Sequence, residues 1–217
     1  MKLRLWNMSA RDNLNLYVFL LVLIVVGAVF GVLLASALTL DQQQELADQM
    51  GIYLSSIRHA DQFNHAAAFW DSFIFYGKWL GLIWLLGVSV IGLPLVLVLD
   101  FLKGMLIGFA VALLVDQLAW KGVLFFLAST ALPNAIVVPA LLIASVSASR
   151  FAFFLVRERL FRKKGQLLPP FLAHTAVTGL MLAVLLCAAL YEAFVAPVLL
   201  SQVAPQVDVQ VSNVVRE

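Results

Sequence analysis

Five long stretches of apolar residues are separated by more polar segments along the chain. A helix needs about 17–25 apolar residues to cross a bilayer, and each stretch reaches that length. The predicted spans cover residues 16–40, 79–99, 104–120, 122–149 and 171–200. The pattern therefore predicts an all-α, polytopic integral membrane protein with about five transmembrane helices in a single membrane domain.

Two of these stretches leave an alternative open. The first follows Lys2, Arg4 and Arg11 and so resembles a signal peptide, but it is longer than the roughly 7–15 apolar residues of a cleavable segment. We therefore expect an uncleaved anchor. The region 93–120 contains charged residues, so it forms either full spans or a re-entrant element whose backbone needs protein or water around it. Hydropathy favours full spans.

The composition agrees with a membrane protein. Of the 217 residues, 63% are hydrophobic and 12% are charged, whereas soluble domains are about 45–50% apolar and about 25% charged. A chain of this size could not hide so much apolar surface from water, which excludes a soluble enzyme or a disordered chain. Cys187 is the lone cysteine and can form no internal disulfide, and the net charge of +2 favours no nucleic-acid partner.

The basic residues predict the orientation. Lys and Arg concentrate on the cytoplasmic side of membrane proteins. With residues 1–15 inside, ten of the 14 Lys and Arg residues fall on the inner side, six of them between Arg150 and Lys164. The pattern predicts an inner N-terminus, a basic cytoplasmic segment at 150–170 and an outer C-terminal tail at 201–217.

The segment 41–77 is the longest piece outside the predicted spans. Its apolar residues recur at helical spacing, which predicts an amphipathic helix on the outer face, and an aromatic run before Trp79 predicts an anchor at the membrane interface. The apolar face either docks an external partner or covers the tops of the spans. The candidate docking residues are Leu46, Met50, Tyr53, Leu54 and Ile57.

Polar residues within or near the predicted spans are a second group of candidates. Each costs several kcal/mol in the bilayer unless it is paired or wet. A structural protein would use such residues for hydrogen bonds or ion pairs between helices, and a transporter would use them as proton or ion relays. The small number of these residues favours the structural role. We expect Asp100 to pair with Lys103 at an inner turn, and Glu192 to face the bundle or an outer aqueous pocket. The candidates are Asp100, Lys103, Asp116, Asn134 and Glu192.

Small residues and prolines predict how the helices pack. Three motifs with two glycines four residues apart begin at Gly27, Gly77 and Gly104, and such spacing lets two backbones approach closely. The contact is either within the chain or between copies, so a homo-oligomer stays open. The candidate break and packing residues are Pro94, Gly104, Gly108, Pro133 and Pro197.

Motifs for catalysis are weak. The chain contains no H-E-x-x-H, Walker loop or C-x-x-C motif. His59, Asp61 and His65 have spacings that suit a metal but also arise by chance. Ser89 and His174 faintly resemble the pair of a rhomboid-type protease, although they are expected at different membrane depths. The sequence therefore predicts no catalytic residue, metal or cofactor.

The order of several motifs resembles the stage II sporulation protein M family of endospore-forming bacteria. The motifs are Gly77-Lys-Trp-Leu80, Gly87-Val-Ser-Val-Ile-Gly-Leu-Pro94, Phe101-Leu-Lys-Gly104, Leu132-Pro-Asn134 and Tyr191-Glu-Ala-Phe-Val-Ala-Pro197. The resemblance covers nearly the whole chain. It matches the family at Pro94, Lys103, Gly104, Pro133, Asn134, Glu192 and Pro197.

The resemblance implies a non-enzymatic role. Such proteins act in forespore engulfment as membrane scaffolds for two cell-wall hydrolases, the lytic transglycosylase D and the amidase P. It therefore implies the sporulation septum and the engulfing membrane of the mother cell as the location. A small transporter or channel component that uses Glu192 and broken helices is the alternative.

Overall fold

The computed structural model describes residues 10–39, 41–46, 48–49, 64–89, 91–156 and 167–199, without the side chains of 10–13, 117–126 and 128–129. All long elements in these ranges are helical. They are α1 (Ala10–Ser36), α3 (His65–Gly87), α4 (Gly92–Phe126), the π-helical turn η2 (Leu127–Ala131), α5 (Leu132–Leu155) and α6 (Leu168–Phe194).

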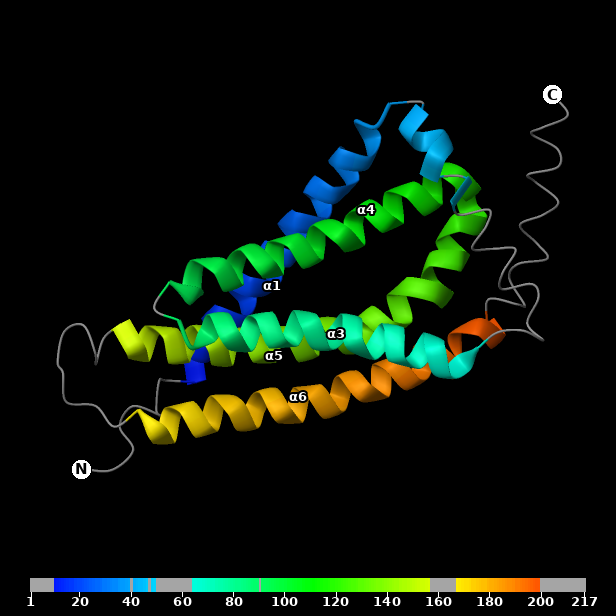
Figure 1. Cartoon of the computed structure of the whole chain (residues 1–217). Helices are drawn as coiled ribbons and strands as arrows, with labels where there is room; N and C mark the ends of the chain where they lie inside the picture. The colour runs from blue at the N-terminus through cyan, green and yellow to red at the C-terminus, as the bar shows by residue number, and fades with distance from the viewer. Residues whose placement is uncertain are drawn as a thin grey trace, which may run out of the picture.

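The helices form two groups. In Figure 1, α1 crosses behind α4, while α3, α5 and α6 run alongside one another below them. The main apolar core lies within the lower group, where Leu80 and Ile83 of α3 pack with Val137 and Leu141 of α5 and Leu185 of α6. A smaller core joins Leu20 and Ile24 of α1 to Leu142 and Val146 of α5.

Two glycine motifs bring α1 and α4 into backbone contact. A Cβ atom built at Gly27 would overlap the carbonyl oxygen of Phe101, and one built at Gly104 would overlap that of Ile24. Gly31 and Gly108 repeat the relationship one turn further along. The two motifs therefore pack against each other within one chain. The third motif differs, because a Cβ at Gly77 or Gly81 would meet nothing within 4 Å.

Four of the described helices are long and apolar enough to cross a membrane. They are Leu14–Ser36, Gly92–Asp116, Leu132–Leu155 and Leu168–Leu199. The predicted all-helical, polytopic membrane protein is thus confirmed. Helix α3 has 23 residues but is not among the four, and the five-span count and the orientation of the termini stay predictions.

The helix boundaries differ from the predicted spans in the middle of the chain. Residues 79–99 do not form one helix, because α3 ends at Gly87 and α4 begins at Gly92. A Cβ at Gly92 would overlap the carbonyl oxygen of Leu86, so the turn depends on a glycine there. Three of the four intervening residues are apolar and none is charged, which is why hydropathy does not reveal the break. Residues 104–120 lie inside the 35-residue α4, and 122–149 are divided between α4, η2 and α5.

The predicted outer segment is shorter than expected. Asn64 caps α3, accepting a hydrogen bond of 3.1 Å from the backbone N–H of Ala67, so residues 65–77 belong to that helix. Residues 41–46 and 48–49 are helical, as the amphipathic pattern predicts. Residues 51–63, the basic segment 157–166 and the C-terminal tail from 200 onward lie outside the described ranges.

Candidate functional site: a polar cavity between four helices

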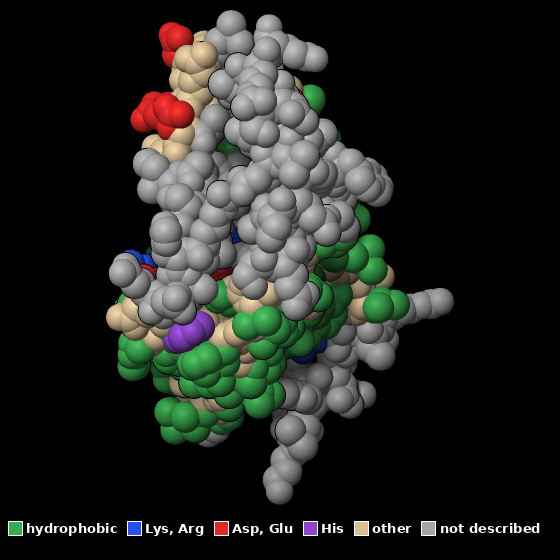
Figure 2. All heavy atoms as spheres, turned by 90° about the vertical axis from the view of Figure 1, so that its right-hand side faces the viewer, with side chains coloured by type: hydrophobic (Ala, Val, Ile, Leu, Met, Phe, Trp, Pro, Cys, Tyr) green, Lys and Arg blue, Asp and Glu red, His purple; other side chains and the backbone are tan. Residues whose placement is uncertain are grey.

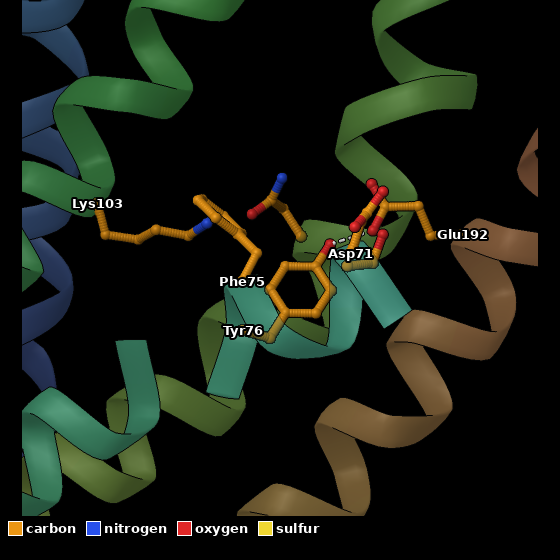
Figure 3. Close-up of a pocket in the computed structure, with 7 residues that line it drawn as sticks. Asp71, Phe75, Tyr76, Lys103 and Glu192 are labelled. Carbon is orange, nitrogen blue, oxygen red and sulfur yellow. Dashed lines mark hydrogen bonds between the residues drawn. The ribbon is translucent and has the colours of Figure 1, made fainter. Parts of the chain in front are cut away.

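A polar cavity of about 400 Å³ lies where α3, α4, α5 and α6 meet (Figure 3). The two helix groups diverge here, and each wall contributes polar side chains. Helix α3 supplies four lining residues, and each of the other three helices supplies one. The lining residues are Asp71, Ser72, Phe75, Tyr76, Lys103, Asn134 and Glu192.

Lys103 enters the cavity from α4 and is only 6% exposed. Its Nζ lies 5.7 Å, 5.9 Å and 5.8 Å from the ring centroids of Phe75, Tyr76 and Trp79. These distances fall within the range of cation–π attraction. Lys103 forms no hydrogen bond or ion pair with any described residue. Among the described residues, the close contacts of this ammonium group are therefore with aromatic rings, and none of these residues accepts a hydrogen bond from it.

The opposite side of the cavity is acidic. The Tyr76 hydroxyl donates a 2.7 Å hydrogen bond to Oε2 of Glu192, which links α3 to α6. Figure 3 shows the Asp71 carboxylate on the same side as Glu192, facing Lys103 across the cavity. Asp71 is exposed and Glu192 is half-buried. The cavity thus has a deep cationic side and an acidic side with access to solvent.

Asn134 lines the same cavity from the start of α5. Its Nδ2 donates a 2.8 Å hydrogen bond to the carbonyl oxygen of Thr130 in η2. Its Oδ1 is buried and has no hydrogen-bond partner among the described residues. Asn134 therefore stabilises the break before Pro133, and one of its acceptors stays unpaired among the described residues.

Asp100 does not belong to this cavity. It is 2% exposed, and its Oδ1 accepts a 2.8 Å hydrogen bond from the hydroxyl of Ser145 on α5. The expected pair with Lys103 is not formed among the described residues, because Asp100 faces α5 and Lys103 faces the rings of α3. Helix α4 begins at Gly92, so both residues sit within this helix instead of at a turn.

His174 has a serine partner other than Ser89. Its Nδ1 lies 2.9 Å from Oγ of Ser147 on α5, and its ring stacks on Phe151 with centroids 5.7 Å apart. Ser89 instead accepts a 3.3 Å hydrogen bond from the backbone N–H of Ile91 at the turn. Ser147 was not singled out from the sequence. The available signal was its place with Ser145 and Ser149, at alternate positions of an otherwise apolar span.

The family comparison covers the helices that build the cavity. A family model described as stage II sporulation protein M matches residues 20–197. The chain belongs to that family. No curated protein and no solved structure matches the chain. The matched range includes all seven lining residues and both packed glycine motifs.

Three positions that carry the resemblance to this sporulation family, Lys103, Asn134 and Glu192, meet in the cavity although they are far apart in sequence. The prolines among these positions lie at helix ends instead: Pro94 in the first turn of α4, Pro133 in the first turn of α5 and Pro197 after α6.

The other predicted site residues lie elsewhere. Asp116 is exposed at the end of the apolar part of α4. Leu46 is half-buried in the short helical segment, whereas Met50, Tyr53, Leu54 and Ile57 fall outside the described ranges. The described residues contain no group of three metal-binding side chains, and His59 and Asp61 are not among them.

Proposed function

We propose that this membrane protein is a non-catalytic scaffold that organises peptidoglycan hydrolases at the sporulation septum during forespore engulfment. The observation that carries the proposal is the match of residues 20–197 to the sporulation family. The partners proposed on this basis are the lytic transglycosylase D and the amidase P, and the location is the septum and the engulfing membrane of the mother cell.

The interhelical bonds support a fixed body more than a moving one. The Ser145 hydroxyl on α5 donates a hydrogen bond to Asp100 on α4. The Tyr76 hydroxyl on α3 donates one to Glu192 on α6. Each bond crosses between helices in surroundings where few alternative partners exist, which favours one arrangement. A rigid membrane body that holds two enzymes together raises their effective concentration even when each contact is weak.

The segment after α1 is the proposed docking surface. Its described residues carry the exposed acidic side chains Asp41, Glu45 and Asp48 and the half-buried Leu46. Figure 2 shows acidic side chains gathered at the top of the face in view. The helical pattern continues this apolar side through Tyr53 and Leu54. Such a surface offers apolar area for contact and charge for orientation of a partner.

Co-purification from sporulating cells tests the proposal. The full chain is tagged, extracted in mild detergent and examined for bound hydrolases by mass spectrometry. We expect the amidase and the transglycosylase with the unaltered protein, and their loss from a triple variant with Leu46, Tyr53 and Leu54 each changed to Ser. A matched control changes Gln44, Asp48 and Gln49 to Ser on the polar side of the same segment. Retention of both enzymes by the apolar-face variant would rule out this docking surface.

A second candidate function is transport, favoured by the cavity that contains Lys103 and Glu192. A transporter would use Glu192 as a proton or ion relay. In proteoliposomes, Glu192→Gln would then abolish a pH-dependent flux that the unaltered protein supports. The scaffold proposal instead expects no flux from either protein and normal recruitment of hydrolases by Glu192→Gln.

A further inference from the structure

The charges of the cavity are separated in a way that matches one class of ligand. The ammonium of Lys103 lies on one side, and the carboxylates of Asp71 and Glu192 lie on the other (Figure 3). A simple anion would be attracted by the first and repelled by the second. A simple cation would be repelled by Lys103 and attracted by the carboxylates. A molecule with both charges satisfies both sides at once.

The unused hydrogen-bonding atoms also point to a ligand. Lys103 is only 6% exposed and forms no hydrogen bond or ion pair with a described residue. The buried Oδ1 of Asn134, which lines the same cavity, has no partner either among the described residues. Buried polar groups are normally paired, and an ammonium group gains most from a charged acceptor such as phosphate.

The size and surroundings of the cavity restrict the ligand further. Its volume of about 400 Å³ is at the small end of the range for ligand sites. On α3, the neighbouring Trp70, Ile74 and Phe75 are 57%, 48% and 47% exposed. This apolar border would suit the chain of an amphiphile whose polar head enters the cavity.

We propose that the cavity binds a zwitterionic headgroup with a phosphate and a primary ammonium, as in an ethanolamine phospholipid. Lys103 holds the phosphate, and Asp71 and Glu192 hold the ammonium. Tyr76 positions Glu192 through its hydrogen bond, and the Oδ1 of Asn134 accepts a further hydrogen bond from the ammonium. This site is independent of the scaffold role, since it requires no protein partner.

Binding to the purified full chain tests the assignment. Native mass spectrometry and thermal unfolding in detergent would be recorded with phosphatidylethanolamine, with phosphatidylglycerol and with dissolved O-phosphoethanolamine. We expect phosphatidylethanolamine to bind more tightly than phosphatidylglycerol, which lacks the ammonium. Binding of the dissolved compound would show that a free zwitterion also fits, whereas binding of the lipid alone would restrict the site to a membrane headgroup. Either result supports the proposal, and binding of neither zwitterion overturns it.

Variants on each side of the cavity separate this site from general lipid adhesion. We expect Lys103→Met and Glu192→Gln each to weaken phosphatidylethanolamine binding about tenfold, the loss of one charged hydrogen bond. Asp71→Asn is the safeguard against misfolding, because Asp71 is exposed, and it should weaken the ethanolamine lipid but not phosphatidylglycerol. Lys78→Met, at an exposed position of α3, is the matched control and should change nothing. Equal binding of both lipids, unaffected by Asp71→Asn and Glu192→Gln, would overturn the assignment.

Discussion

Gly27 of α1 lies against the carbonyl oxygen of Phe101 on α4 so closely that no Cβ atom fits between them. Gly104 stands in the same relationship to Ile24, in the reverse direction. Backbone contact of this kind gains van der Waals energy along the whole crossing, which is the main source of helix association in lipid. The α1–α4 pair is therefore held by the absence of side chains at four positions.

The first prediction compares glycines with the same spacing but different surroundings. Gly27→Ala and Gly31→Ala must push α1 away from α4, so we expect each to lower the free energy of unfolding by about 1–3 kcal/mol. Gly81→Ala adds a methyl group where nothing lies within 4 Å, and the higher helix propensity of alanine should leave stability equal or raise it by up to about 1 kcal/mol. Denaturant unfolding in detergent measures both, and equal effects at Gly27 and Gly81 would contradict the assigned interface.

The same glycines show how much of the helix packing can be predicted from the sequence. Spacing predicts that three motifs allow close packing, but Gly27, Gly104 and Gly77 have identical patterns and only the first two are used in this way. The choice depends on which helix lies opposite, and that is a property of the whole fold. Hydropathy likewise predicts the apolar spans but not the break at 88–91, because a turn made by glycine and backbone hydrogen bonds leaves apolar side chains unchanged.

Part of the candidate site could be predicted from the sequence. The cost of polar groups in a bilayer singles out Lys103, Asn134 and Glu192 without any structure. Their meeting in one cavity could not be derived, because they come from three helices. Tyr76 was missed as a partner of Glu192, since a tyrosine in an aromatic run has an ordinary explanation at the membrane interface.

The second prediction concerns Asp100 and Ser145. Asp100→Asn keeps an oxygen that can accept the serine hydrogen bond, so we expect little loss of stability. Asp100→Ala leaves the Ser145 hydroxyl unpaired in the core and should cost about 1–3 kcal/mol. Adding Ser145→Ala to Asp100→Ala should recover part of that loss, because no unpaired hydroxyl then remains. The three variants are compared by denaturant unfolding, and an asparagine variant as unstable as the alanine variant would argue against the bond.

The third prediction concerns the link between α3 and α6. In a double-mutant cycle, Tyr76→Phe and Glu192→Ala should show a coupling energy of about 1–2 kcal/mol, because either change alone removes the same charged hydrogen bond. Tyr191→Phe is the matched control. The Tyr191 hydroxyl is buried next to Glu192 in sequence but has no hydrogen-bond partner among the described residues. Its removal should not destabilise the protein, and a Tyr76–Glu192 coupling near zero would show that the bond contributes nothing.

The fourth prediction separates a structural from a catalytic use of His174. Ser147→Ala removes the partner of a buried imidazole nitrogen and should cost about 1–3 kcal/mol of stability, whereas Ser89→Ala removes only a weak contact at a turn and should cost less than about 0.5 kcal/mol. Hydrolase recruitment in sporulating cells should survive Ser89→Ala, and it should survive Ser147→Ala at temperatures where that variant stays folded. A Ser147→Ala protein of normal stability that no longer supports engulfment would instead assign chemistry to the Ser147–His174 pair.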